Sequence, residues 1–198
     1  MELQQKQDQL EAIADSIKNR EIDIEIAKTC TNPVPGEGNP DAEILFIGEA
    51  PGAQEDKQGR PFIGASGKFL DEMLASIGLE RKDVFVTNIV KFRPPKNRDP
   101  KPNEIKACLP ALLQQIGIIQ PKLVVFLGRH AMNVFMPQLK ISEAHGQEIT
   151  KTVEIDGNSI TATFLPLYHP AAALYNGGMR KTLLEDFARI PKILELIK

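Results

Sequence analysis

Four short apolar runs separated by helix-like stretches constrain the fold of this chain more than any other feature. The runs lack polar alternation, which is typical of parallel strands buried on both faces. Between them, apolar residues recur at helical spacing. Strands that alternate with helices predict an α/β fold with a mostly parallel sheet. The expected strands are residues 43–48, 83–90, 122–127 and 160–167, and the expected helices are residues 66–77, 103–119, 130–136 and 178–197.

Prolines and one Asp-Gly pair predict where these elements bend or turn. Pro110 predicts either a kink in the helix 103–119 or a later start of that helix. Pro191 predicts a kink in the last helix. The pair Asp156-Gly157 favours a tight hairpin turn just before the fourth strand.

The length of 198 residues suits a single domain, 1–198, that begins with an N-terminal helical segment over residues 1–28. Residues 29–42 are rich in proline and glycine and are expected to form a loop. The net charge of -2 shows no global preference for nucleic acid, so any basic surface must be local. No apolar stretch resembles a signal peptide or a membrane span, and we expect a cytoplasmic monomer.

Polar side chains follow the carboxyl ends of three predicted strands. Glu49, Glu55 and Phe62 lie after the first strand, Asn88 ends the second, and His169 follows the fourth. Each residue taken alone is more often a solvated carboxylate, a core ring, a turn amide or a capping histidine. Because the carboxyl ends of parallel strands meet at one edge, we expect these side chains to lie together. The other histidines, His130 and His145, have no supporting context and are expected to be structural.

These residue types suit the recognition and departure of a heterocyclic ring. Carboxylates serve as acid, base or charge stabiliser. An amide offers both a donor and an acceptor, as reading a base edge requires. A neutral imidazole held by the following Pro170 can donate to a developing oxyanion. A basic loop suited to phosphate contacts contains Lys91, Arg93, Lys96, Arg98 and Lys101.

Three motifs in this order resemble the family 4 uracil-DNA glycosylases over residues 34–190. They are GEAPGAQEDKQGRPFIG from Gly48, TNIVKFRPPKNRDP from Thr87, and YHPAA from Tyr168. The resemblance implies a three-layer α/β/α sandwich around a four-stranded, mostly parallel sheet. It also implies hydrolysis of the N-glycosidic bond of uracil in single- or double-stranded DNA, which leaves an abasic site.

The resemblance further implies a role for each residue of the predicted site. Phe62 would stack on the extruded uracil, Asn88 would read its pairing edge, and His169 would stabilise the departing anion at O2. Glu55 would lie near C5 and help to exclude thymine. Glu49 would position water or stabilise the sugar cation.

The chain departs from the family at the cysteines that usually ligate a [4Fe–4S] cluster. The N-terminal pair of ligand positions falls on Glu21 and Ile24, and the third position is Phe92. Only Cys108 matches a ligand position, while Cys30, the other cysteine, is offset from the pair. Because thiolate clusters need four ligands, no cluster, no metal and no other cofactor are expected.

Two smaller departures concern water activation and the wedge that enters the duplex. Ala50, in the expected uracil pocket, occupies a position where other branches of the superfamily have a catalytic Asp or Asn. Ala173 replaces the leucine wedge that is usual in the family, so Leu174 or Tyr175 would take that role. The other expected DNA contacts are Arg60, Lys91, Arg93, Lys96 and Arg98.

The residues leave three other functions open. One is a glycosylase of the same superfamily with a broadened preference that includes hypoxanthine or xanthine. Another is a protein that binds uracil or abasic DNA without turnover. The third is a doubly wound nucleotide-binding domain, which the missing phosphate-binding fingerprints disfavour.

Overall fold

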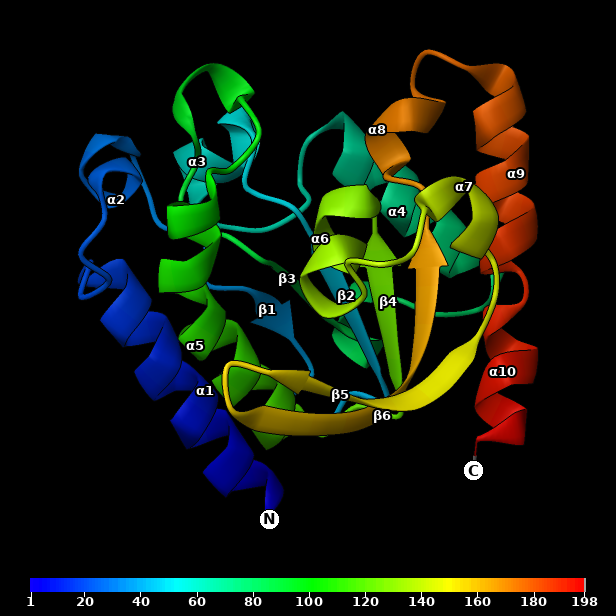
Figure 1. Cartoon of the computed structure of the whole chain (residues 1–198), viewed down its shortest axis with the longest axis horizontal. Coiled ribbons are helices and arrows are strands. Elements are labelled where there is room, and N and C mark those ends of the chain that lie inside the picture. The colour runs from blue at the N-terminus through cyan, green and yellow to red at the C-terminus, as the bar shows by residue number, and fades with distance from the viewer. Residues whose placement is uncertain (198) are drawn as a thin grey trace.

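The computed structural model describes residues 1–197, and its central sheet has helices on both faces (Figure 1). Within that range, six strands form one sheet in the order β1-β3-β2-β4-β6-β5. The α/β class and the parallel sheet are confirmed, but the sheet has six strands rather than the expected four. The strands are β1 (Glu37–Gly38), β2 (Ile44–Gly48), β3 (Phe85–Asn88), β4 (Leu123–Leu127), β5 (Ile149–Ile155) and β6 (Asn158–Leu167).

The two additional strands lie at the edges of the sheet and are antiparallel to their neighbours. β1 pairs with β3 and lies in the segment 29–42, which was expected to be a loop without strands. A β-carbon on Gly38 would overlap the Val84 carbonyl oxygen, so the close approach of this strand depends on glycine. β5 pairs with β6 as a hairpin. Asp156 and Gly157 both have positive φ, as a type I′ turn requires, which confirms the predicted turn.

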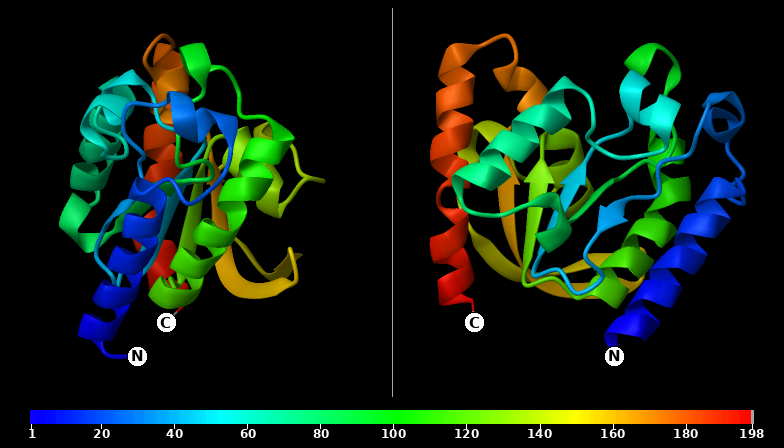
Figure 2. Two further views of the ribbon diagram at one scale, coloured as in Figure 1. Left: turned by 90° about the vertical axis from the view of Figure 1, so that its left-hand side faces the viewer. Right: turned by 180° about the vertical axis from the view of Figure 1, so that it is seen from behind.

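The strands are buried on both faces because their side chains enter two separate cores. Leu45 and Ile47 of β2 pack into the core beneath α1 and α5, whereas Ile44 and Phe46 pack into the core beneath α4 and α9. Figure 2 shows these two helical layers on either side of the sheet. The longer helices are α1 (Leu3–Lys18), α4 (Ala65–Ser76), α5 (Pro102–Ile119), α6 (Arg129–Phe135), α9 (Gly177–Phe187) and α10 (Ile190–Leu196).

Proline acts differently in the two helices where it predicted a disturbance. α5 begins at Pro102 and continues through Pro110, so the alternative of a later start is wrong. The expected last helix is instead two helices, α9 and α10. Pro191 lies in the first turn of α10, where backbone N–H groups have no acceptor within the helix, so proline costs no helical hydrogen bond there.

Short helices occupy several of the segments that connect the strands. α3 falls in the segment after β2 that was expected to be a loop, where Gly52 precedes its first residue. None of the helices within the described range combines the length and the apolar composition that a bilayer crossing requires. The short helices are α2 (Glu25–Thr29), α3 (Ala53–Gln58), α7 (Ile141–Ala144) and α8 (Pro170–Ala173), with 3-10 turns at Arg81–Asp83 and Pro95–Asn97.

The register of the parallel strands brings their carboxyl ends to one edge. Gly48 at the end of β2 is paired with Asn88 at the end of β3, and Leu127 of β4 is paired with Leu167 of β6. The arrowheads of β4 and β6 both point to this edge in Figure 1. The segments that follow these four strands therefore surround one region, as the sequence predicted.

Candidate active site

A cavity of about 790 Å³ opens at the carboxyl edge of the sheet. It is lined by residues that follow β2, β3, β4 and β6, so each parallel strand contributes to it. The predicted site residues that line it are Glu49, Ala50, Glu55, Phe62, Asn88, Arg98 and His169. Asp99, Arg129, His130 and Tyr168 also line it and were not predicted.

Asn88 lines this cavity with a buried side chain that has one unpaired polar atom. The side chain is buried, and its Oδ1 has no hydrogen-bond partner among residues 1–197. Leaving a buried acceptor unpaired is costly, so such an atom is a good candidate for binding a ligand donor. A β-carbon on Gly48 would overlap both Asn88 Oδ1 and the Phe62 ring. The glycine therefore allows the amide and the aromatic ring to share one small space.

His169 has a defined tautomer because its backbone neighbour uses one ring nitrogen. It caps the N-terminus of α8, and its Nδ1 accepts a hydrogen bond of 3.1 Å from the Ala171 N–H. Burial lowers the pKa of His169 to about 4, so the imidazole is neutral at pH 7. With Nδ1 accepting, the proton of the neutral ring is on Nε2. The ring centroid lies 5.8 Å from that of Phe62.

The lowered pKa of His169 predicts that acid destabilises the fold. The unfolded state takes up a proton near pH 6.5 and the folded state only near pH 4, so stability falls between these values. At about 1.4 kcal/mol per pH unit, the loss amounts to about 3 kcal/mol. In chemical denaturation at pH 7 and pH 4, His169→Asn should lose less stability than the unmutated protein. An equal loss in both proteins would contradict the buried neutral imidazole.

Glu55 organises the loop that presents Phe62. Its two carboxylate oxygens accept hydrogen bonds from the backbone N–H groups of Gly52 at 3.1 Å, Ile63 at 2.9 Å and Gly64 at 2.8 Å. One side chain thus joins the start of α3 to the segment that follows Phe62. Phe62 itself has a φ of 50°, an uncommon conformation for a bulky residue. The Glu55 carboxylate holds the two residues that follow it, Ile63 and Gly64.

Replacing Glu55 by alanine should therefore lower stability. Three backbone donors would lose a charged acceptor in a partly buried loop, and we expect a loss of about 2–4 kcal/mol in the free energy of unfolding. Denaturant unfolding of Glu55→Ala measures this loss. Lys57→Ala, which truncates an exposed side chain of the same helix, is the control and should change stability little. Similar stabilities for the two variants would show that the carboxylate does not hold the loop.

Glu49 belongs to a charged cluster at the wall of the cavity. Its carboxylate lies 3.8 Å from His130 Nε2, which in turn lies 3.3 Å from Asp99 Oδ2. Arg129 adds positive charge to this cluster, and its Nε donates to His130 Nε2 at 3.2 Å. Burial raises the pKa of Glu49, and this favours its use as a proton acceptor near neutral pH.

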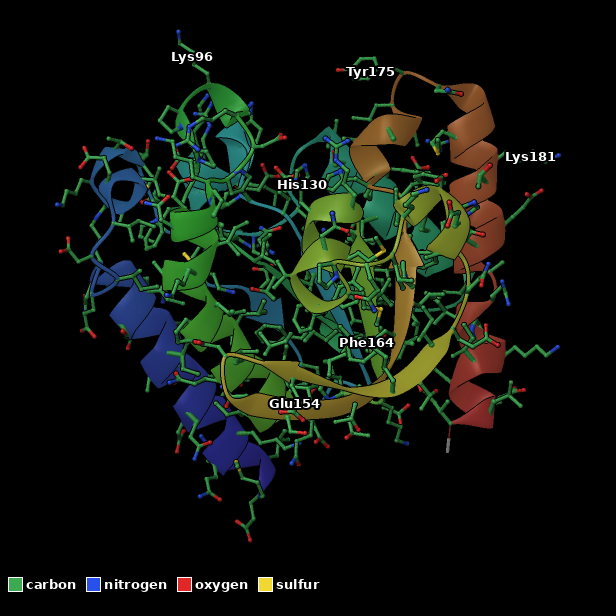
Figure 3. All side chains as sticks on the ribbon, viewed as in Figure 1. Lys96, His130, Glu154, Phe164, Tyr175 and Lys181 are labelled. Carbon is green, nitrogen blue, oxygen red and sulfur yellow. The ribbon has the colours of Figure 1, made fainter. Side chains whose placement is uncertain are left out.

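His130, which was expected to be structural, lines the cavity beside Glu49. Figure 3 shows His130 at the end of the sheet where the strands finish. The available signal was its position two residues after Gly128, where the third parallel strand ends. His145 lies elsewhere, where its Nδ1 is 2.6 Å from Asp186 Oδ2.

The predicted DNA contacts differ in how freely they face solvent. Lys96 and Tyr175 stand out from the carboxyl end of the sheet (Figure 3), and Tyr175 is 94% exposed. Leu174 beside it is half-buried. Arg60 makes a two-point ion pair with Glu37, at 2.8 and 2.9 Å.

Two arginines of the basic loop are held by neighbouring side chains. Arg98 pairs with both oxygens of Glu104, and this hydrogen bonding lowers the pKa of that carboxyl. Arg93 donates to Asn97 at 2.8 Å. These contacts order the loop between β3 and α5 beside the cavity.

The prediction that Lys91 contacts DNA is wrong. Its side chain is fully buried and its amine is directed into the protein, where it cannot meet a phosphate. Its sequence position suggests a place in the basic loop because only one residue separates it from Arg93. Its position just after β3 instead turns the side chain into the core.

The residues at the expected cluster positions do not fit a [4Fe–4S] cluster. Ile24, Phe92 and Cys108 are buried in one apolar core, which also contains Cys30. The Cys30 sulfur accepts a hydrogen bond from Arg20 at 3.2 Å. Two cysteines are half of the thiolates that such a cluster needs. Phe92, with no exposed surface, contributes apolar volume to this core where the family has a ligand.

Comparison with known proteins places the chain in a family. A protein-family model described as "Uracil DNA glycosylase superfamily" matches residues 35–190. A type-4 uracil-DNA glycosylase of Sulfurisphaera tokodaii is 46% identical over 193 residues, which covers 90% of this chain and 85% of the relative. One from Archaeoglobus fulgidus is 45% identical, with 85% of each chain covered. One from Thermotoga maritima is 42% identical, covering 83% of this chain and 84% of the relative. The resemblance seen in the three motifs is confirmed, and the chain belongs to the type-4 uracil-DNA glycosylases of this superfamily.

Proposed function

We propose that this protein excises uracil from DNA by hydrolysing its N-glycosidic bond, which starts base excision repair. The observation that carries the proposal is the buried, unpaired Oδ1 of Asn88 beside the Phe62 ring and the neutral His169. Uracil has a donor at N3 and acceptors at O4 and O2 along one side of the ring. An amide and an imidazole N–H provide the complementary groups.

Recognition requires that the base leave the duplex. Glycosylases extrude the target nucleotide into a pocket, at a cost of a few kcal/mol that is smaller for a mispaired base. Asn88 Oδ1 would accept from uracil N3–H while Nδ2 donates to O4. Phe62 would stack on the ring. Glu55, which lines the cavity while it holds the loop, would approach C5 and leave no room for the methyl group of thymine.

Catalysis would stabilise charge on both fragments of the breaking bond. The bond between C1′ and N1 breaks with its electron pair going to the base, so a sugar cation and a uracil anion form. The Nε2–H of His169 would donate to O2 of the anion. Glu49 would stabilise the cation and accept the proton of the water that adds to C1′. The small side chain of Ala50 leaves this task to the carboxylates.

The proposed substrate is single- or double-stranded DNA that contains uracil. Exposed Lys96 and Tyr175, which stand out from the carboxyl end of the sheet, support contacts with the strand, together with Arg60, Arg93, Arg98 and Leu174. Tyr175, with its ring free in solvent, is the better candidate for a wedge than half-buried Leu174. The proposed active form is a cytoplasmic monomer. Sedimentation at catalytic concentration would test the oligomeric state.

Oligonucleotide cleavage tests the proposed function. Single- and double-stranded oligonucleotides that contain uracil, hypoxanthine, thymine or cytosine are incubated with the protein and then treated with alkali, which breaks the strand at abasic sites. Scission at uracil and not at thymine is expected. Equal scission at hypoxanthine would favour the broader preference, and binding of uracil DNA without scission would contradict the enzymatic function.

We also propose that the protein acts without an iron–sulfur cluster. Protein purified without oxygen should contain far less than one iron per chain and no broad thiolate–iron absorbance in the visible range. Uracil excision should be unaffected by an iron chelator. Stoichiometric iron, or activity that follows the iron content, would contradict this proposal.

A further inference from the structure

Lys91 has a buried amine for which the proposed reaction has no direct use. The side chain is 0% exposed. Its Nζ donates to Thr87 Oγ1 at 2.6 Å, to Gln115 Oε1 at 2.8 Å and to the Asn88 main-chain oxygen at 2.9 Å. An ammonium group has three N–H donors, and each of them meets an acceptor here. Among the ion pairs of residues 1–197, none involves Lys91.

The acceptors around Lys91 are themselves oriented by one carbonyl group. Gln115 Nε2 donates to Pro35 O at 2.9 Å, and Thr87 Oγ1 donates to the same oxygen at 3.0 Å. Since the Thr87 hydroxyl uses its proton on Pro35, it presents a lone pair to Lys91. The network therefore joins the end of β3, the helix α5 and the segment before β1 at one buried point.

The Lys91 amine contacts the backbone of Asn88, the residue proposed to read the base. Beyond Asn88, the Ile89 N–H donates to Gly48 O at 2.9 Å and the Val90 N–H donates to Glu49 O at 3.0 Å. The backbone is thus tied to the end of β2 on one side and to the Lys91 amine on the other. The orientation of the peptide group after Asn88 is the property that the amine controls.

We infer that Lys91 is a positioning residue for base recognition, whose amine orients the Asn88 main chain and thereby directs the Asn88 amide into the cavity. The inference rests on the proposed function, because it assigns Asn88 to the reading of uracil. It also explains why Lys91 is fully buried while the other basic residues of the loop are half-buried or exposed. The amine acts through the backbone and does not touch the base.

The protonation state of Lys91 should affect the geometry of this network. Burial lowers the pKa of the Lys91 amine to about 7. The titratable group that faces it is the Cys108 thiol of α5, whose pKa burial raises, so this thiol is uncharged near neutral pH. Thr87 of β3 and Gln115 of α5 are neutral. Loss of one proton leaves two N–H donors for three acceptors, which weakens the hold on the Asn88 carbonyl.

The test compares Lys91→Met with Thr87→Val, which removes one acceptor and keeps the shape of the side chain. Lys106→Met, an exposed lysine of α5, is the matched control. Single-turnover excision of uracil and affinity for the same oligonucleotide are measured at temperatures where thermal melting shows each variant to be folded. The Asn88 side-chain amide resonance is followed by NMR between pH 5 and pH 10.

Lys91→Met is expected to slow single-turnover excision by about 10- to 100-fold, as a small misplacement of a binding group does, while DNA affinity changes little. Thr87→Val should have a smaller effect in the same direction. In the unmutated protein the Asn88 amide resonance should shift with a midpoint near pH 7, and this shift should be absent in Lys91→Met.

Two results would overturn the positioning role. One is a folded Lys91→Met variant with the excision rate of Lys106→Met. The other is an Asn88 resonance that titrates equally with and without the lysine, which would indicate that the amine only stabilises the core. An unmutated protein that leaves uracil in place would contradict the proposed function instead, and the NMR titration would still report on the coupling.

Discussion

Replacing His169 by alanine is expected to slow uracil excision by about 10²–10³-fold while leaving the fold in place. The neutral ring has its proton on Nε2 because Nδ1 accepts from Ala171. This N–H would meet a charge that exists only as the bond breaks, so its loss raises the barrier and leaves substrate binding nearly unchanged. Single-turnover measurement of excision, together with DNA affinity, separates the two effects.

The matching control for His169→Ala removes an imidazole that lies outside the cavity. His145→Asn removes the imidazole ring that contacts Asp186 and should keep the excision rate within a few-fold of the unmutated protein. His169→Gln restores an N–H donor on a flexible side chain and should recover part of the lost rate. An alanine variant as fast as His145→Asn would remove His169 from the mechanism.

The second large effect is expected for Asn88→Asp, a change of one atom in a buried site. The carboxylate keeps an acceptor for N3–H but replaces the donor to O4 by a negatively charged oxygen. Two facing acceptors in a buried pocket repel each other, and sites built to hydrogen-bond a group lose about 10⁴-fold or more when the match fails. We therefore expect uracil excision by Asn88→Asp to fall by at least about 10³-fold.

Asn158→Asp provides the control for Asn88→Asp. It makes the same chemical change at an exposed position at the start of β6, which does not line the cavity. The comparison uses excision rates on uracil and on cytosine, whose pairing edge has a donor at N4 and an acceptor at N3. Retention of full uracil activity by Asn88→Asp would show that another group reads the base.

The elements of the fold that follow local patterns were predictable. The four parallel strands were found from apolar runs and the hairpin from Asp156-Gly157, because strand burial and turn chemistry depend on a few neighbouring residues. The short edge strand β1 was not found, since two residues without an apolar pattern form a strand only when β3 lies beside them. α3 was missed because its N-terminus depends on Gly52 and on the side chain of Glu55.

The candidate site was predictable in its residues but not in their relations. Glu49, Phe62, Asn88 and His169 were identified because parallel strands bring their carboxyl ends together. The position of His130 after the third parallel strand indicated the same sheet edge, but not the contact of 3.8 Å with Glu49, because that contact depends on how the segments after β2 and β4 pack together. Lys91 was misplaced for a similar reason: whether a lysine faces solvent or the core depends on the direction that the chain takes after β3.

The sequence by itself determined the alternation of strands and helices, the family, and the four side chains gathered at one sheet edge. It also determined that the chain has two cysteines, whereas a [4Fe–4S] cluster needs four thiolates. Only the tertiary structure decided which nitrogen of His169 has the proton, that Asn88 Oδ1 is left unpaired, and that the Lys91 amine donates to the Asn88 main-chain oxygen. Local patterns encode burial and turns, whereas hydrogen-bond partners and protonation states depend on groups that are distant in sequence and meet only in the folded chain.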